Sequence, residues 1–97
     1  MAILTMFEVH GDPDELLTKM ESAVPDEQVQ QLASQHGGIS STIVRTDRGI
    51  MVVNHWESEE GMEAMAAEMR PKVEGPGVGP QLDWRMHEVL RHRAPNT

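Results

Sequence analysis

The stretch IMVVNHWES, residues 50–58, decides the fold. Its apolar first half has the length of a strand, and its polar and aromatic second half closes that strand. Ser58 is then a good helix N-cap. Glu59 and Glu60 follow in the first helical turn, where the positive end of the helix dipole favours carboxylates. A strand that passes directly into a helix is therefore expected here.

Turn and cap signals divide the rest of the chain. The sequence GDP at residues 11–13 ends one strand and begins a helix, with aspartate as N-cap and proline at the first helical position. Pro25 disfavours a helical residue before it, so this helix should kink or restart there. The glycine pair at residues 37–38 ends it, and the turn at residues 47–49 makes a hairpin. The sequence predicts strands over residues 2–10, 39–45, 50–56 and 83–92, helices over residues 12–36 and 58–73, and a Gly/Pro-rich connector or lid over residues 74–82.

This order of elements, β-α-β-β-α-β, is that of the ferredoxin-like split βαβ arrangement. It predicts a single α+β domain over residues 1–97, with a four-stranded antiparallel sheet in the order 4-1-3-2 and two helices on one face. The first strand is apolar on both alternating sets of side chains, as in strands that are covered on both faces. Only one face meets the helices, and an uncovered apolar face is typical of an interface. We therefore expect a second copy to pack there and form a homodimeric α/β barrel.

Composition excludes several classes of function. The 16 acidic and 8 basic residues give a net charge of −8, which argues against binding to nucleic acids or to anionic membrane surfaces. The absence of cysteine excludes disulfides, thiolate nucleophiles and cysteine-based zinc sites. No apolar run approaches the roughly 20 residues of a membrane span, and the N-terminus has no signal-peptide pattern. We therefore expect a cytoplasmic protein.

The motif HWES at residues 55–58, preceded by the valines at residues 52–53, resembles the dimeric α/β-barrel proteins of the antibiotic-biosynthesis-monooxygenase type. The segment around residues 8–9 of the first strand supports the same resemblance. The resemblance implies two ferredoxin-like subunits whose sheets join into a barrel, with a ligand cavity between the sheet and the helices of each subunit. Members include cofactor-independent oxygenases of aromatic polyketides and haem-degrading enzymes.

The resemblance does not extend to the haem-degrading residues. Thr5, Met65 and Glu74 stand where that branch has an asparagine, a tryptophan and a haem-ligating histidine. Neither haem nor another cofactor is therefore predicted. The polyketide oxygenases use asparagine, tryptophan and tyrosine to polarise a phenol and promote its reaction with oxygen. This chain has no tyrosine, so the resemblance leaves Asn54 and Trp56 as pocket groups.

The helix after the motif carries an inward stripe of methionines at helical spacing. Thioether side chains adapt to irregular apolar surroundings, so the stripe suits core packing or a pocket for a hydrophobic small molecule. Trp56 likewise is either an anchor for the end of its strand or a pocket group. The predicted pocket residues are Thr5, Phe7, Asn54, Trp56, Met62, Met65 and Met69.

Three histidines suggest a second polar cluster. His10 ends the first strand, His55 lies at the end of the third, and His87 lies near the start of the fourth. We take strands one and three to run parallel and strand four to run against them, which brings all three histidines to one end of the barrel. Such a cluster could bind a metal or transfer protons, since neutral imidazole suits both. Hydrogen bonds to neighbours such as Glu8 and Glu88 are the favoured alternative, and no metal is predicted.

Two functions remain open at this point. The first is a cofactor-independent monooxygenase-like protein that acts on or binds a small hydrophobic metabolite in the cavity between sheet and helices. The second is a non-catalytic small-molecule-binding or stress-associated dimeric barrel protein. Polar groups that converge on the cavity would favour catalysis, and a cavity lined only by apolar side chains would favour binding.

Overall fold

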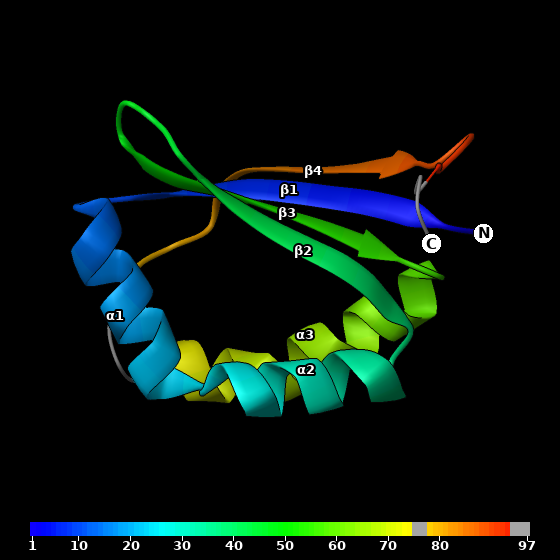
Figure 1. The fold of residues 1–97 in the computed structure, drawn as a ribbon, viewed down its shortest axis with the longest axis horizontal. Helices are drawn as coiled ribbons and strands as arrows, with labels where there is room; N and C mark the ends of the chain where they lie inside the picture. Colours follow the sequence, from blue (N-terminus) through cyan, green and yellow to red (C-terminus); the bar gives the residue numbers. More distant parts are fainter. Residues whose placement is uncertain (75–77, 94–97) are drawn as a thin grey trace.

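The computed structural model describes residues 1–74 and 78–93 of the chain. Its elements in order are β1 (Ile3–His10), α1 (Pro13–Ala23), α2 (Asp26–Gln35), β2 (Gly38–Arg45), β3 (Gly49–Trp56), α3 (Glu59–Glu74) and β4 (Leu82–Glu88). The strands form one sheet in the order β2-β3-β1-β4, and every neighbouring pair is antiparallel. The helices lie together on one face of this sheet (Figure 1). The predicted ferredoxin-like α+β fold is confirmed.

The helix boundaries follow from caps and prolines. Asp12 accepts a hydrogen bond from the backbone N–H of Glu15 at 3.0 Å and caps α1, and Pro13 occupies its first position. The predicted break at Pro25 divides the first helical segment into α1 and α2, because Val24 before it adopts an extended conformation. Ser58 accepts a hydrogen bond from the Gly61 N–H at 3.1 Å at the start of α3.

The C-terminal part differs from the sequence prediction. β4 ends at Glu88, so residues 89–92 lie outside the strand that was expected to reach residue 92. Of the predicted connector over residues 74–82, residues 75–77 lie outside the described ranges. Val78 is buried in the same core cluster as Val9, and Leu82 already belongs to β4. The two ends of this connector are therefore parts of α3 and β4.

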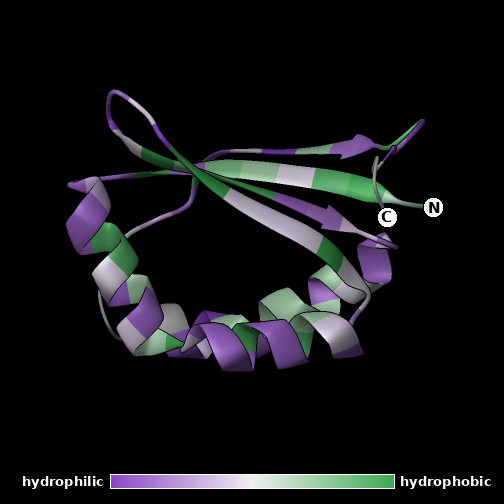
Figure 2. Ribbon diagram, viewed as in Figure 1, coloured by the Kyte–Doolittle hydropathy of each residue, from purple (hydrophilic) through white to green (hydrophobic). Residues whose placement is uncertain are grey.

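The core fills the space between the sheet and the helices. One cluster of buried residues consists of Val9, Leu16, Ile50, Val52 and Val78, and the other of Ile3, Trp56, Met62 and Met65. β1 and β3 supply the sheet side of both clusters through alternate residues. Figure 2 shows the mostly hydrophobic character of β1, one of the two central strands of the sheet.

Within residues 1–74 and 78–93, the other face of the sheet carries no helix (Figure 1). Its side chains include Leu4 and Met6 of β1 and Met51 and Val53 of β3, all partly buried within the single chain. Residues 89–93 run along one end of this face, where the Val89 N–H donates to the Ala2 carbonyl oxygen at 2.9 Å. We call this the outer face. Within the described ranges, no helix is long and apolar enough to cross a membrane.

Candidate functional site

One row of side chains crosses the helix-facing side of the sheet. Ser41 of β2 is the register partner of Asn54 of β3, Asn54 is the partner of Thr5 of β1, and Thr5 is the partner of Met86 of β4. Directly opposed residues of antiparallel strands point to the same face. These four residues, one from each strand, are called the cross-sheet row. Neighbouring strands lie about 4.8 Å apart, so Asn54 and Met86 are roughly 10 Å apart.

Two hydrogen bonds organise the polar part of this row. The Ser41 hydroxyl donates to Asn54 Oδ1 at 2.6 Å, and the Trp56 indole Nε1–H donates to Thr5 Oγ1 at 3.0 Å. Thr5 is only 2% exposed and Trp56 is also buried, so the second bond satisfies two groups of the core. Asn54 is partly buried and Ser41 is exposed. The first bond therefore lies where a ligand can approach.

The apolar side chains beside the row are accessible toward β4. Trp84 and Met86 on the helix-facing side of β4 are 44% and 37% exposed. The helices make their main contacts with β2 and β3, which leaves these β4 side chains less covered. Phe7, next to Thr5 on the same face of β1, is partly buried. The exposed apolar side chains of β4 thus lie on the same face of the sheet as the partly buried Asn54, with the buried Thr5 between them.

The predicted pocket residues divide into two groups. Trp56, Met62 and Met65 are buried together in one core cluster, and Met69 packs against that cluster. Core packing thus explains why the methionines of α3 are spaced along one face of that helix. Asn54 and Phe7 are partly buried, and Thr5, the register partner of Asn54, is buried.

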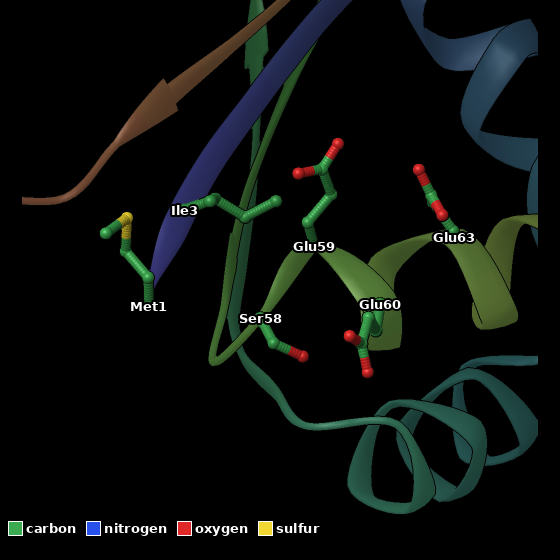
Figure 3. A pocket seen from close by; sticks show the side chains of 6 residues that line it. All are labelled: Met1, Ile3, Ser58, Glu59, Glu60 and Glu63. Carbon is green, nitrogen blue, oxygen red and sulfur yellow. The ribbon is translucent and has the colours of Figure 1, made fainter.

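Two surface hollows are lined by none of the α3 methionines Met62, Met65 and Met69. The larger, about 450 Å³, is lined by Met1, Ile3, Ser58, Glu59, Glu60 and Glu63. Figure 3 shows the three glutamate side chains that project from the start of α3 at this hollow. The other, about 370 Å³, is lined by Met6, Phe7, Glu8, Met51, Asp83 and Arg85. Phe7 is the one predicted pocket residue that lines either of these hollows.

The predicted cluster of His10, His55 and His87 is wrong in one member. β1 and β3 are antiparallel, not parallel, because the hairpin reverses β3 relative to β2. His55 and His87 are both register partners of Leu4, whereas His10 is the partner of Gly49. His10 therefore lies at the opposite end of the sheet, about 20 Å from the other two.

The histidines have other partners. His10 Nε2 lies 3.3 Å from Glu8 Oε2, as the alternative interpretation expected. His55 is 5% exposed on the outer face, and the centre of its ring is 4.7 Å from that of His92. Its Nε2 has no hydrogen-bond partner within the described ranges. Among these residues, no three histidine, aspartate or glutamate side chains are placed to hold a metal ion.

Comparisons with known proteins bear on the fold. No protein-family model and no curated protein matches the chain. Among solved structures, SnoaB, a cofactor-independent oxygenase from Streptomyces nogalater, aligns with a TM-score of 0.63 and 17% identity over 98% of this chain and 96% of that chain. A monooxygenase from the gene ActVA-Orf6 of Streptomyces coelicolor, in complex with the ligand Nanaomycin D, aligns with a TM-score of 0.55 and 21% identity over 98% and 91%. A dimeric ferredoxin-like protein from an uncultured marine organism gives 0.57 and 15% over 94% and 92%.

The chain shares the ferredoxin-like fold of these solved structures. This confirms the fold that the HWES motif indicated. At 15–21% identity the likeness shows the fold alone, and the chemistry has to be argued from the residues of this chain.

Three residues of the candidate site were not predicted from the sequence: Ser41, Trp84 and Met86. A signal for Ser41 was present. The hairpin turn fixes the register of β2 against β3, and counting back from Arg45 opposite Ile50 places Ser41 opposite Asn54. Met86 and Trp84 could not be placed this way. β4 pairs with β1, which is distant in the sequence, and the register of this pair shifts near Phe7.

Proposed function

We propose that this dimeric α/β-barrel-type chain is a cofactor-independent monooxygenase-like protein that binds a small hydrophobic metabolite on the helix-facing side of its sheet. The observation that carries the proposal is the cross-sheet row, in which one oriented amide, that of Asn54, lies on the same face as the exposed apolar side chains of β4. The span of roughly 10 Å from Asn54 to Met86 suits two or three fused rings.

The amide can supply the chemistry that such a reaction requires from a protein. An N–H donor aimed at a phenol or ketone oxygen stabilises the negative charge that develops when the substrate loses a proton. The activated substrate is then the reductant for oxygen. Conversion of a ring CH₂ to C=O by one O₂ releases one water, so the atoms and electrons balance without a cofactor.

A binding function without catalysis is the second candidate. The cross-sheet row contains a serine, an asparagine, a threonine and a methionine, and so has no titratable side chain to remove the proton. Thr5 is already engaged by Trp56. A protein that only holds the metabolite needs nothing beyond the amide and the apolar surface.

An oxygen electrode separates these candidates. A hydroxylated anthrone, a three-ring ketone with an activated CH₂, is added to wild-type protein and to Asn54→Ala. Catalysis predicts oxygen uptake above the uncatalysed rate, with uptake at least tenfold slower in Asn54→Ala. Binding to the wild type without oxygen uptake would support the second candidate. No binding to the wild type would contradict both.

We also propose that the chain is a homodimer in the cytoplasm, with the outer face as its interface. Partly buried Leu4, Met6 and Met51 on a helix-free face support the interface, and one structural neighbour is described as dimeric. The absence of cysteine suits a reducing compartment. The net charge of −8 gives no reason to expect a nucleic-acid or membrane partner.

A further inference from the structure

We infer that Ser41 fixes the orientation of the Asn54 amide, so that the site selects ligands that accept a hydrogen bond over ligands that only donate one. This inference rests on the proposed function, since it concerns the same ligand site. It assigns Ser41 a role as a positioning residue, because Ser41 acts on the ligand through Asn54.

The length of the bond between the two side chains determines the orientation. Ser41 Oγ and the nearest atom of the Asn54 amide are 2.6 Å apart. Hydrogen bonds between two oxygens span about 2.5–3.0 Å, whereas those from an amide nitrogen span about 2.7–3.2 Å. The separation therefore fits the carbonyl oxygen of Asn54 as the atom that faces Ser41.

This orientation leaves the amide nitrogen for a ligand. With Oδ1 bound to Ser41, the NH₂ group of Asn54 points away from β2. It donates to no acceptor among the described residues. Thr5 Oγ1, the polar atom of the next residue in the row, already receives the indole N–H of Trp56. The free polar group at the site is thus a pair of N–H donors, which an oxygen of a ketone or phenolate can satisfy.

The register set by the hairpin brings Ser41 into this position. The pairing of β2 with β3 is continuous from Arg45 opposite Ile50 to Ser40 opposite His55, so Ser41 is opposite Asn54, and the register shifts only beyond Ser40, toward Gly38. Successive side chains of a strand point to opposite faces of the sheet. Ser40 therefore points to the outer face and Ser41 to the helix-facing side. The two adjacent serines thus point to opposite faces of the sheet, so a substitution of Ser40 is a matched control for the same substitution of Ser41.

The test uses three bicyclic probes of similar size: 1-indanone, which only accepts a hydrogen bond, indole, which only donates one, and indane, which does neither. Binding is followed by the shift of the Asn54 side-chain NH₂ signals in ¹⁵N–¹H correlation spectra. We expect wild-type protein to bind 1-indanone about tenfold more tightly than indole.

The variants isolate the role of Ser41. In Ser41→Ala the amide can turn over, so the preference for 1-indanone over indole should fall to within about threefold, with the affinity for indane unchanged. Ser41→Thr should restore the preference, since threonine keeps the hydroxyl. Ser40→Ala should leave the preference at its wild-type value.

The outcomes are distinct. A preference that persists in Ser41→Ala, or that falls equally in Ser40→Ala, would overturn the inference and leave the ligand site in place. Equal binding of all three probes to the wild type would do the same. If none of the probes shifts the Asn54 signals, the proposed ligand site itself is wrong, and the inference fails with it.

Discussion

Trp56 and Thr5 form a buried polar pair at the level of single residues. Replacing Trp56 by phenylalanine removes the indole donor and leaves the Thr5 hydroxyl unsatisfied in the core. An unsatisfied buried polar group costs about 1–3 kcal/mol, so Trp56→Phe should lower the free energy of unfolding by that amount. Urea denaturation measures it. Trp84→Phe on the exposed surface of β4 should change the free energy of unfolding by less than about 0.5 kcal/mol.

A double-mutant cycle tests whether the hydrogen bond is the cause. With Thr5→Val already in place, Trp56→Phe no longer leaves a hydroxyl without a hydrogen-bond partner. It should therefore lower the free energy of unfolding by less than it does in the wild type. Equal costs in the two backgrounds would show that ring packing, and not the hydrogen bond, explains the loss.

At position 61 glycine is expected to be more stable than alanine, although helices ordinarily favour alanine over glycine. A Cβ at this position would overlap the backbone carbonyl oxygen of His36, because the first turn of α3 lies against the end of α2. Overpacking of this kind costs about 1–3 kcal/mol, more than the roughly 1 kcal/mol by which alanine favours a helix. Gly61→Ala should therefore lower the melting temperature.

Exposed Ala67 of the same helix provides the comparison. There alanine is the better residue, so Ala67→Gly should be the destabilising change, by about 0.5–1 kcal/mol. A Gly61→Ala protein that melts above the wild type would show that α3 can move away from His36 at little cost.

At the scale of the elements, the cap of α1 can be tested directly. Asp12→Ala removes the acceptor for the Glu15 N–H and should destabilise the protein by about 1 kcal/mol. Asp12→Asn keeps a capping oxygen and should stay close to the wild type. Chemical denaturation of the three proteins provides the measurement, and equal stabilities of Asp12→Ala and Asp12→Asn would argue against the cap.

The elements that could be predicted are those with local signals. Pro25 and the glycines after α2 mark breaks that depend on neighbouring residues alone, and the hairpin turn sets β2 against β3. The direction of β1 relative to β3 depends on contacts distant in sequence, so the predicted parallel arrangement was wrong and His10 was misplaced. The candidate site contains residues that local signals predict and residues whose position depends on contacts distant in sequence. Asn54 was predicted, whereas Trp84 required the register of β4.

At the scale of the whole molecule, the outer face can be tested as a dimer interface. Met51→Glu places a charge in the middle of that face and should convert a dimer into a monomer, as measured by analytical ultracentrifugation. Leu17→Glu, at an exposed apolar position of α1, should leave the dimer intact. Each copy carries a charge of −8, so added salt should also tighten the wild-type dimer. A monomeric wild type at all concentrations would contradict the proposed interface.

The central place of β1 affects how the chain can be synthesised. β1 is synthesised before the other strands, yet its two partners in the sheet are β3 and the last strand, β4. At about 5–20 residues per second, a ribosome leaves the nascent β1 without its last partner for several seconds. An apolar strand with unpaired edges readily joins other chains. Growing chains that stop before β4 should therefore depend on chaperones, and the yield of soluble protein should fall sharply when translation is slowed late in the message.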